Sequence, residues 1–507
     1  MTVRGLLQAC MQARPEMRAD LPAVCAALDV ACTGVTYDSR RAGPGSIFVA
    51  LRGQVADGAA FAAPAFAAGA AAVVAERAPD RTPDAGCAPW IVVGDARAAL
   101  AALAGEFFGH PSREMQVIGV TGTNGKTTTA YLISAMLAAA GTRNGLMGTV
   151  VYRIGDREFQ AARTTPEAPE LQGFMRAMVT DGCGACVMEA SSHALALRRV
   201  DGIHFSAAVF TNLTRDHLDF HGDMEAYFAA KRRLFEMLPA GAPALINSDD
   251  PRGASLLDIV PQAVTYAINR PADVTPGPLS FGIDGLRFEA RTPQGVVRVR
   301  SRLVGKPNVY NILAAVGAAA ALGVPIEAIE RGVAWLPGVP GRFEVASSPG
   351  DDITVVIDYA HTDDALRNLL ETARPLAARR LITVFGAGGG RDRTKRPLMG
   401  MVAARLSDLV VLTSDNPRGE DPERIIEEVR RGAEPEARQR SAEVVAIADR
   451  RAAIHHAIEH AEAGDVVLIA GKGHEKYQEI DGLVTPFDDV AVAREELGTR
   501  RVRSRVG

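Results

Sequence analysis

The sequence predicts an α/β protein built from three domains, and three observations carry this prediction. Patterns typical of buried strands alternate with helix-like segments along most of the chain, which favours parallel sheets with right-handed crossovers. The chain has 507 residues, whereas single cores stop growing near roughly 250 to 300 residues. Two prolines and two glycines within Leu336–Gly341 indicate a linker between two such blocks.

The composition is that of an ordinary globular protein. Hydrophobic residues make up 47% of the chain and charged residues 23%, and the net charge is -4. The basic cluster at Arg500–Arg505 is expected to be a solvated end, because a nucleic-acid-binding face usually carries a longer basic stripe. We find neither a signal-peptide pattern nor an apolar run of about 18 residues. We therefore expect a cytoplasmic monomer that binds small molecules, without a nucleic acid partner or membrane insertion.

The six cysteines are too sparse for a disulfide framework in a chain of this size. Cys183 and Cys186 form a C-x-x-C pair, which could bind zinc or carry out redox chemistry. No second pair lies nearby in the sequence, and Cys186 opens an apolar run. Packing in the core is therefore the favoured interpretation of both residues.

The first domain is predicted over residues 1–110. It is rich in alanine, and short apolar strands are expected at 47–51, 72–75 and 91–93. These features predict a small N-terminal α/β domain. It should end at Gly109–Ser112, where glycine and proline favour a turn.

The second domain is predicted over residues 111–340, with a parallel sheet at its centre. Strands are expected at 115–121, 184–188, 207–212 and 244–247, helices at 224–238 and 309–322, and a β-rich insertion at 274–303. Strands separated by helices pair in parallel, because a crossover returns each strand to the same direction.

The third domain is predicted over residues 341–507. Its strands are expected at 353–357, 381–385, 409–413 and 466–470. Helix-like sequence follows each strand, which predicts a C-terminal Rossmann-like α/β domain. The glycine-rich stretch Gly386–Gly390 could belong to a dinucleotide site, but it runs into charged residues instead of the apolar helix that such a site needs.

A loop with two glycines joins the strand at 115–121 to a helix expected at 131–140. Its residues are Gly122, Thr123, Asn124, Gly125, Lys126, Thr127 and Thr128. The glycines let successive N–H groups face one point, and Lys126 adds a full positive charge, so the loop is expected to bind the phosphates of ATP. Thr127 would place its hydroxyl on Mg²⁺. Val120 stands where the usual pattern has its first glycine, and the loop alone does not distinguish a kinase, an ATPase and a ligase.

Polar residues follow two further strands of the second domain, at the edge where open α/β sheets bind ligands. Glu189 follows one strand and His217 the other. Mg²⁺ prefers oxygen ligands, so Glu189 suits a phosphate-bound ion better than His217 does. Loop capping is the alternative for Asp216, Asp219 and His221. A zinc hydrolase would also explain this density of Asp and His, but the sequence contains no H-E-x-x-H pair.

Lys231 lies on the apolar face of the helix expected at 224–238. The apolar residues at helical spacing around it are Tyr227, Phe228, Leu234, Phe235 and Leu238. A lysine in such a position usually extends to water, but it could also point into the site. Periodicity alone does not choose between the two.

Several motifs occur in one order along the chain and together resemble the Mur ligase family. They are Asp38-Ser39-Arg40, Gly122-Thr-Asn-Gly-Lys-Thr-Thr, Glu189-Ala-Ser-Ser-His, Asn212-Leu-Thr-Arg-Asp-His-Leu-Asp-Phe-His, Lys231, Gly305-Lys-Pro-Asn308-Val-Tyr-Asn311, Gly341-Arg342-Phe-Glu, Asp358-Tyr-Ala-His361 and Gly471-Lys-Gly-His-Glu475. The resemblance covers nearly the whole chain. It implies an N-terminal uridine-nucleotide-binding domain, a central ATP-binding domain and a C-terminal amino-acid-binding domain.

The resemblance also implies a reaction of peptidoglycan precursor synthesis. ATP would phosphorylate the D-glutamate carboxylate of UDP-MurNAc-L-Ala-D-Glu, and an amine would attack the acyl phosphate. ATP is the implied cosubstrate and Mg²⁺ the implied cofactor. The implied catalytic residues are Lys126, Lys231, His217 and Glu189. The implied metal ligands are Thr127, Glu189, His217 and Lys231 as N6-carboxylysine, and the implied adenine-nucleotide contacts beyond the loop are Asn308, Arg342, Asp358 and His361.

The choice of amino acid depends on Asp415-Asn416-Pro417-Arg418, which follows the strand expected at 409–413. Asn-Pro is a good turn starter, so a plain turn is one interpretation. The other uses the Arg418 fork, which can grip the distal carboxylate of meso-diaminopimelate, a group that lysine lacks. In the family, arginine at this place is typical of diaminopimelate ligases, and Arg391, Gly471 and Glu475 match the other contacts. A lysine-adding ligase and a folylpolyglutamate synthetase-like ligase are the alternatives.

The resemblance also implies contacts to the muramoyl nucleotide. The matching residues are Tyr37, Ser39, Gln54, Val55 and Ala56 for the uridine nucleotide, and Arg163, Thr164, Thr165, Ser191, Leu197 and Arg199 for the sugar and peptide. Arg163 and Leu197 depart from one branch of the family, which has Asn and Gln there. Those two individual contacts are therefore open, although the substrate class is not.

Overall fold

The computed structural model describes residues 1–13, 25–53, 56–77 and 89–506. The chain separates into two compact units, and each is described by itself. Unit 1 comprises residues 1–121, 141–208 and 230–243, and unit 2 comprises residues 122–140, 209–229 and 244–507. The domain limits predicted at 110 and 340 stay a prediction.

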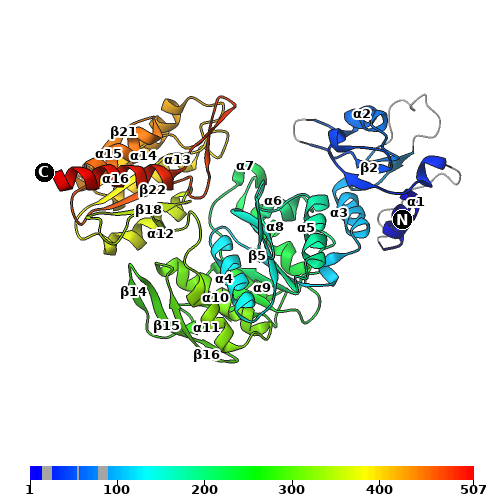
Figure 1. Cartoon of the computed structure of the whole chain (residues 1–507), viewed down its shortest axis with the longest axis horizontal. Helices are drawn as coiled ribbons and strands as arrows, with labels where there is room; N and C mark the ends of the chain where they lie inside the picture. The colour runs from blue at the N-terminus through cyan, green and yellow to red at the C-terminus, as the bar shows by residue number, and fades with distance from the viewer. Residues whose placement is uncertain (14–24, 54–55, 78–88, 507) are drawn as a thin grey trace. The chain divides into compact units, whose positions relative to one another are not determined.

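The N-terminal part of unit 1 is a parallel sheet with helices on both faces (Figure 1). Its strands, in spatial order, are β1 (Gly34–Thr36), β2 (Ser46–Val49), β3 (Ala72–Ala75) and β4 (Trp90–Val92). Alternate residues of a strand point to opposite faces. Helices α1 (Val3–Ala13) and α3 (Ala96–Phe107) share one core with Ile47, whereas α2 (Ala62–Ala67) shares the other with Phe48.

The described strands of the central sheet follow the order β12-β11-β10-β5-β9-β6-β7-β8. Unit 1 supplies β5 (Gln116–Thr121), β9 (Ala185–Glu189) and β6 (Asn144–Met147), which are parallel, and the antiparallel β7 (Val151–Ile154) and β8 (Arg157–Gln160). Helices α5 (Ala168–Thr180) and α6 (Ser192–Ala196) follow β8 and β9. Helix α8 (Met224–Glu236) begins in unit 2 and ends in unit 1.

Unit 2 contains the helix that follows the phosphate loop and the last strands of this sheet. They are α4 (Lys126–Ala139), β11 (Ala244–Asn247) and β12 (Val264–Tyr266), together with α7 (Leu218–His221), α9 (Pro251–Leu257), α10 (Lys306–Ala321) and α11 (Ile326–Trp335). Strand β10 (Ala207–Phe210) lies at the limit between the units. The predicted β-rich insertion is confirmed as an antiparallel sheet of β13 (Thr275–Pro276), β14 (Ser280–Gly282), β15 (Gly285–Thr292) and β16 (Gly295–Ser301).

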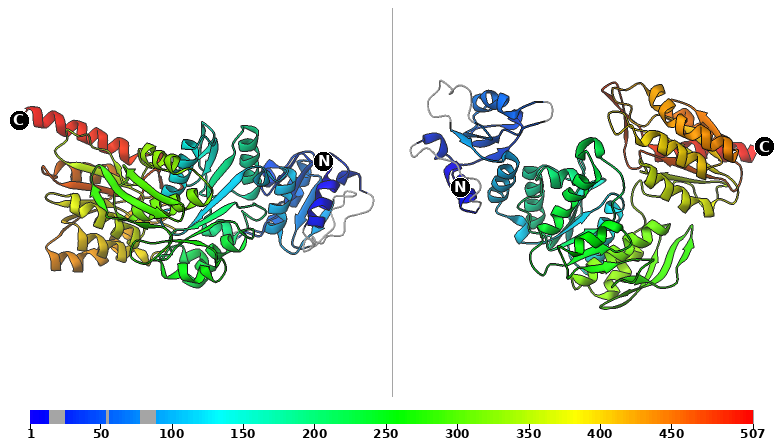
Figure 2. Two further views of the ribbon diagram at one scale, coloured as in Figure 1. Left: turned by 90° about the horizontal axis from the view of Figure 1, so that it is seen from below. Right: turned by 180° about the vertical axis from the view of Figure 1, so that it is seen from behind.

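The C-terminal sheet of unit 2 has the order β17-β18-β22-β19-β20-β21. All but β17 (Glu344–Val345) are parallel: β18 (Thr354–Asp358), β22 (Val466–Ala470), β19 (Leu381–Phe385), β20 (Leu409–Leu412) and β21 (Glu443–Ala446). One face packs against α12 (Asp363–Ala373), α13 (Lys395–Leu406) and α14 (Pro422–Arg440), the other against α15 (Arg450–Glu459) and α16 (Asp489–Val506) (Figures 1 and 2). A hairpin of β23 (Tyr477–Ile480) and β24 (Leu483–Pro486) follows β22.

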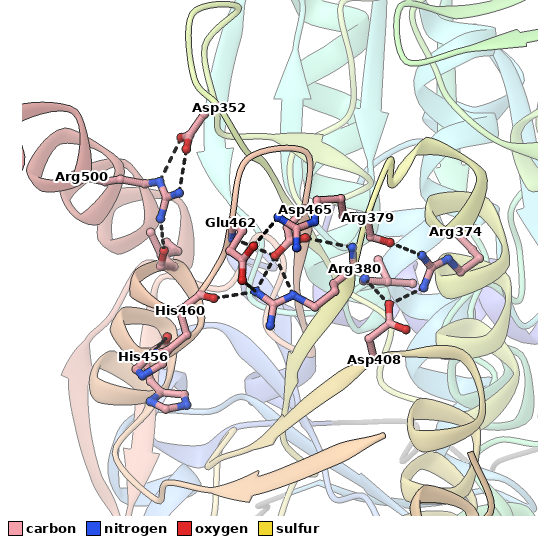
Figure 3. A network of polar contacts seen from close by, with 12 residues as sticks. Asp352, Arg374, Arg379, Arg380, Asp408, His456, His460, Glu462, Asp465 and Arg500 are labelled. Atoms are coloured by element: carbon pink, nitrogen blue, oxygen red, sulfur yellow. Dashed lines mark hydrogen bonds and ion pairs between the residues drawn. The ribbon is translucent and has the colours of Figure 1, made fainter. Parts of the chain in front are cut away.

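Ion pairs tie together the edge at which the strands of the C-terminal sheet begin (Figure 3). Arg380, before β19, pairs with Asp465, before β22, at 2.8 Å. Arg374 pairs with Asp408, before β20, at 2.5 Å, and Asp408 also accepts the backbone N–H of Leu381 at 2.7 Å. These contacts join the starts of neighbouring strands, so we assign them to the fold. The polar motifs of the sequence lie at the opposite edge, where the strands end.

The predicted α/β class is confirmed, and several strands have the predicted limits, among them Ala244–Asn247, Leu381–Phe385 and Val466–Ala470. Helix α4 begins at Lys126, five residues before the predicted start at 131. The threonines at 127–129 are weak helix formers, but Gly125 in the left-handed region starts the helix earlier. Cys183 and Cys186 are buried free thiols, as expected. None of the described helices has the length and apolar character of a membrane span.

Candidate active site

Two glycines of the phosphate loop allow a close approach that no other residue would permit. Gly122 has a φ of 146°, and a Cβ there would lie 1.8 Å from Oγ1 of Thr211. Gly125 has a φ of 87°, and its Cβ would lie 2.3 Å from Oδ1 of Asn311. Both φ values lie where side chains are disfavoured. The loop therefore depends on glycine for its conformation and for its packing.

The phosphate loop lies on the residues that follow β10. The backbone N–H groups of Thr123 and Asn124 donate to the backbone O and to Oδ1 of Asn212, each at 2.9 Å. Thr211 Oγ1 donates to the backbone O of Asn124 at 2.6 Å. Lys126 Nζ donates to the backbone O of Gly122 at 3.0 Å and of Thr123 at 2.8 Å. The ammonium group is therefore held over the loop, where it can meet a phosphate.

Arg342 lies near the start of helix α4, and Asp358 accepts the backbone N–H of the next residue, Phe343, at 2.7 Å. Arg342 Nη2 donates to Thr127 Oγ1 at 3.3 Å, and its guanidinium stacks 4.6 Å above the ring of Tyr359. Burial raises the pKa of the Asp358 carboxyl, although Arg342 and two backbone N–H groups oppose the shift. The predicted residues Arg342 and Thr127 are thus in contact. A guanidinium here can neutralise charge on a transferred phosphoryl group.

A cavity of about 700 Å³ opens beside the phosphate loop, a size suited to a nucleotide. Asn124 and Gly125 line it, and so do Lys306, Tyr310, Asn311, Asp364 and Thr372, none of which we had assigned from the sequence. Tyr310 and Asn311 lie in the quoted Gly305 motif, which could have indicated them. The predicted residue Asn308 contacts this set of residues: its Oδ1 accepts a hydrogen bond from Asn311 Nδ2 at 2.9 Å. Asp364 and Thr372 belong to no motif, so only the fold identifies them.

Two histidines lie close to the Asp216 carboxylate, and Lys395 acts on it as a positive charge. His217 Nε2 lies 3.3 Å from Asp216 Oδ2, and His361 Nε2 lies 3.8 Å from the same atom. Burial would raise the pKa of Asp216, but His217, His361 and Lys395 lower it to about 2. Burial lowers the pKa of His361, and Lys395 adds to the effect. Asp216 therefore does more than cap its loop, because its carboxylate approaches both His217 and His361, two of the predicted residues.

Glu189 lies at the end of β9 and is 1% exposed. Its Oε1 accepts the backbone N–H of Thr149 at 2.9 Å, and its Oε2 accepts the Thr149 hydroxyl at 3.0 Å. Gly148 lies so close that a Cβ there would be 2.3 Å from Oε1. The carboxylate is thus fixed in one orientation, which suits a metal ligand. Thr149 was missed because it belongs to no motif.

Lys231 is 1% exposed, so its side chain does not extend to water. Of the two orientations that the sequence left open, extension to water is therefore excluded, and the orientation into the site stays a prediction. A buried lysine is costly as a cation. Lys231 and Glu189 belong to unit 1, whereas Thr127 and His217 belong to unit 2.

By the chemistry of their donor atoms alone, these side chains suit a magnesium ion in part. The Thr127 hydroxyl and the fixed Glu189 carboxylate are oxygen donors of the kind that Mg²⁺ prefers, and a carbamate on Lys231 would be a third. His217 is the less usual donor. Within the described ranges, no three His, Cys, Asp or Glu side chains are grouped to hold a metal. The implied ligand set includes a threonine hydroxyl and a modified lysine, which lie outside these four residue types.

Glu167 was not predicted and organises the residues expected to bind the sugar and peptide. It is 6% exposed, and its carboxylate lies 3.0 Å from Arg163 Nη1, 2.8 Å from Arg199 Nε and 3.7 Å from Arg97 Nη1. Arg199 also donates to the backbone O of Thr165 at 3.0 Å. Three guanidiniums around one carboxylate leave excess positive charge, which suits an anionic substrate.

The remaining contacts predicted in unit 1 lie on loops. Thr165 Oγ1 lies 3.3 Å from Ser191 Oγ, and Thr164 Oγ1 lies 3.1 Å from Thr149 Oγ1. The Tyr37 hydroxyl lies 3.5 Å from Glu170 Oε1. Ser39 begins a turn of 3₁₀-helix that Asp38 caps. Ala56 is exposed and Leu197 is half-buried, whereas Gln54 and Val55 lie outside the described residues.

The Asp415–Arg418 segment follows β20, where it faces the segment after β22. Asn416 Nδ2 donates to Glu475 Oε2 at 2.8 Å. Arg418 has a φ of 55°, and its Nη1 donates to the backbone O of Gly389 at 2.7 Å. Gly471 lies so close to Asp415 that a Cβ would be 3.2 Å from Oδ2. Of the predicted residues, Asp415, Asn416, Arg418, Gly471 and Glu475 are thus brought together.

The glycine-rich stretch 386–390 packs against the residues that follow β20. A Cβ on Gly389 would lie 1.8 Å from the backbone O of Pro417, and one on Gly386 would lie 2.3 Å from the backbone O of Thr413. These glycines allow the neighbouring loop to pack closely, which is a different role from that of a dinucleotide fingerprint. Arg391, the last predicted contact, is exposed next to this stretch.

A buried ion pair lies below the amino-acid segment. Arg450 Nη2 lies 2.7 Å from Asp489 Oδ2, and both side chains are 0% exposed. Arg450 also donates to the backbone O of Ser414 at 3.2 Å and of Ala470 at 3.0 Å. The pair therefore joins the ends of β20 and β22 to the first residue of α16. Burial would lower the pKa of Arg450, but Asp489 raises it.

Comparisons with known proteins place the chain in a family. Three family descriptions match: "Mur ligase family, catalytic domain" over residues 31–108, "Mur ligase middle domain" over 120–319, and "Mur ligase, glutamate ligase domain" over 341–473. A protein of Solibacter usitatus named UDP-N-acetylmuramoyl-L-alanyl-D-glutamate--2,6-diaminopimelate ligase is 49% identical over 468 residues, which are 92% of this chain and 93% of that one.

Two solved structures are also similar. One is titled as a UDP-N-acetylmuramoyl-L-alanyl-D-glutamate--2,6-diaminopimelate ligase, with 34% identity, a TM-score of 0.67 and 99% of each chain covered. The other, the MurF ligase of Thermotoga maritima in complex with ADP, is 20% identical with a TM-score of 0.62, covers 92% of this chain and 99% of its own, and supports the fold alone. On the identity and coverage of its relatives, the chain belongs to the Mur ligase family.

Proposed function

We propose that this chain is an ATP-dependent ligase that adds meso-2,6-diaminopimelate to UDP-MurNAc-L-Ala-D-Glu. The observation that carries the proposal is the pair of opposite charges beyond β20 and β22. The Arg418 guanidinium offers two donors to a carboxylate, and the Glu475 carboxylate can accept an ammonium. Meso-diaminopimelate carries both groups at its distal end.

The chemistry divides between the two substrate sites. Backbone N–H groups at 125–128, where helix α4 begins, and the Lys126 ammonium would bind the phosphates of ATP, and Arg342 would neutralise charge on the transferred phosphoryl group. Thr127, Glu189, His217 and Lys231 would hold Mg²⁺, which supplies further charge neutralisation. Transfer to the D-glutamate carboxylate gives an acyl phosphate, and the amine displaces phosphate to form the peptide bond. The reaction would take place in the cytoplasm, where ATP is available.

Lys231 would be carbamylated to N6-carboxylysine and would bind Mg²⁺ in that form. Its complete burial supports this assignment, because a carbamate converts a costly cation into an oxygen donor. Labelled bicarbonate should give a carbamate carbon signal in the NMR spectrum of the wild-type protein. Lys231→Ala should lack that signal, and a signal that survives the substitution would contradict the assignment.

A lysine-adding ligase is the second candidate, and the pocket argues against it. Lysine has a distal ammonium for Glu475 but no distal carboxylate, so Arg418 would lose a charged partner. Arg418 would then keep its contacts to Glu479 at 3.5 Å and to the backbone O of Gly389, but it would lack the stronger charge-assisted contact that a distal carboxylate offers. A folylpolyglutamate synthetase-like ligase would take glutamate, whose short side chain brings no ammonium to Glu475.

One assay tests the proposal. Purified protein is given ATP, Mg²⁺ and UDP-MurNAc-L-Ala-D-Glu, and phosphate release is measured with diaminopimelate, lysine or glutamate. We expect release with diaminopimelate, and a coupled product of tripeptide mass. Release that needs no amino acid would contradict a ligase, and a preference for lysine would contradict the role given to Arg418.

A further inference from the structure

Lys472 is a fully buried cation below the amino-acid pocket that the proposed function does not use. It follows Gly471 after β22 and is 0% exposed. Its Nζ lies 3.0 Å from Asn416 Oδ1, 3.5 Å from Asp415 Oδ1 and 3.8 Å from Glu475 Oε2. A buried ammonium is costly unless it is paired, and here the pairing groups are themselves predicted substrate contacts.

The Asn416 amide shows what this contact does. Two donors converge on Oδ1 of Asn416: the Lys472 ammonium at 3.0 Å and the backbone N–H of Glu479 at 3.0 Å. A lysine ammonium can only donate, so the amide must present its oxygen to Lys472. Its Nδ2 then points to Glu475 Oε2 at 2.8 Å. The orientation of Asn416, and through it that of Glu475, is therefore fixed from below by a cation.

Glu475 also needs Lys472 for its charge. Burial raises the pKa of Glu475 and the neighbouring Asp415 raises it further, whereas Lys472, Asn416 and Arg418 lower it. Burial lowers the pKa of Lys472, and Asp415 and Glu475 raise it. Further charged or titratable groups around this cluster include Tyr359, Tyr477, Arg450 and Asp489. Glu479 is another, and its carboxylate lies 3.5 Å from Arg418 Nε. Among them, Lys472 is the cation whose contacts reach Asp415, Asn416 and Glu475 together.

We propose that Lys472 is a positioning residue for the amino-acid substrate, which keeps Glu475 ionised and oriented to receive the distal ammonium. This inference rests on the proposed function, because it assigns a residue to the pocket for diaminopimelate. Lys472 itself is covered by Asp415 and Asn416 and acts through them. Without it, the half-buried Glu475 would face the buried Asp415 carboxylate with less compensation, and Glu475 would take up a proton at a higher pH.

The test is Lys472→Met, with the KM for diaminopimelate measured from about pH 6 to about pH 9. The variant should raise the KM about ten-fold near neutral pH, because a charged hydrogen-bond partner is lost. The ratio of variant to wild-type KM should fall as the pH rises, since Glu475 regains its charge. Taking the ratio cancels the titration of the substrate. The KM for ATP should stay the same.

Lys476→Met is the matched control. Lys476 lies four residues further along, is exposed and pairs with Asp488 at 2.6 Å, so the same substitution removes a cation outside the pocket. Its KM ratio should stay near one at every pH. An unchanged KM in Lys472→Met, or an increase that does not depend on pH, would overturn the proposal. If wild-type protein fails to use diaminopimelate at all, the proposed function fails instead.

A folding defect in Lys472→Met would also be informative. In that case the double variant Lys472→Met with Glu475→Gln is compared by thermal melting. Removing both charges relieves the uncompensated carboxylate, so the double variant should recover the folded state that the single variant loses. A double variant that is no more stable than the single one would overturn the coupling between the two residues.

Discussion

The two glycines of the phosphate loop pack on neutral partners, whereas the amino-acid pocket lies on buried charges. Around the loop, Gly122 and Gly125 give the close fit, and Thr211 and Asn212 supply the hydrogen bonds. Below the pocket, Lys472, Arg450 and Asp489 are fully buried and ionic. The loop must match the constant shape of a triphosphate, but the pocket must present two opposite charges at fixed places. Buried charges hold such a pattern at the cost of desolvation.

The largest expected effect comes from the one full charge on the loop. Lys126→Met should lower kcat about 10³-fold, because removing one group that stabilises the transferred phosphoryl costs roughly this much. The melting temperature should change little, because Lys126 is only half-buried. Phosphate-release kinetics measure the loss in kcat, and calorimetry measures the melting temperature. A large loss of stability would show that the loop also depends on charge.

The buried pair should be the main contributor to stability below the pocket. Arg450→Met should lower the free energy of unfolding by about 3 to 5 kcal/mol, since it leaves Asp489 buried and unpaired. Urea denaturation measures the loss. The control is Arg500→Met, which breaks an ion pair of the same 2.7 Å length with Asp352 at the surface. That variant should lose about 1 kcal/mol or less.

Arg418→Ala should change the choice of amino acid more than the use of ATP. We expect the KM for diaminopimelate to rise about 30-fold to 100-fold, because a charge-assisted bidentate contact is lost. The preference over lysine should fall by a similar factor, while the KM for ATP stays unchanged. Arg405→Ala, which removes an exposed arginine paired with Glu436, should leave both values as they are. An equal loss for both amino acids would place Arg418 away from the distal carboxylate.

The smallest expected effect concerns the shape of the loop. Gly125→Ala adds a Cβ at a φ of 87° and within 2.3 Å of Asn311 Oδ1, so the KM for ATP should rise about ten-fold. Gly323→Ala is the control, because Gly323 has a φ of 79° and open space around its Cβ. If the two variants behave alike, backbone strain alone explains the loss and the contact with Asn311 does not.

The sequence predicted what depends on local patterns. Apolar runs such as Leu381–Phe385 located the strands, and the glycines with Lys126 located the phosphate loop. The burial of Lys231 could not be predicted, because a helical face is apolar whether its lysine is covered or extends to water. Lys472 and Glu167 were missed for a related reason: each has close partners that are distant in the sequence, Asp415 and Arg199, and a single charged residue carries no periodicity. The resemblance to a family supplied the roles of residues, but not the network that supports them.

The Arg450–Asp489 pair has a consequence for hydrogen exchange. It joins the ends of two strands to the first turn of α16, so these three segments should open as one cooperative unit instead of separately. A molecule bound between Arg418 and Glu475 touches none of α16. It should nevertheless slow amide exchange there, because binding stabilises the closed form of the whole unit.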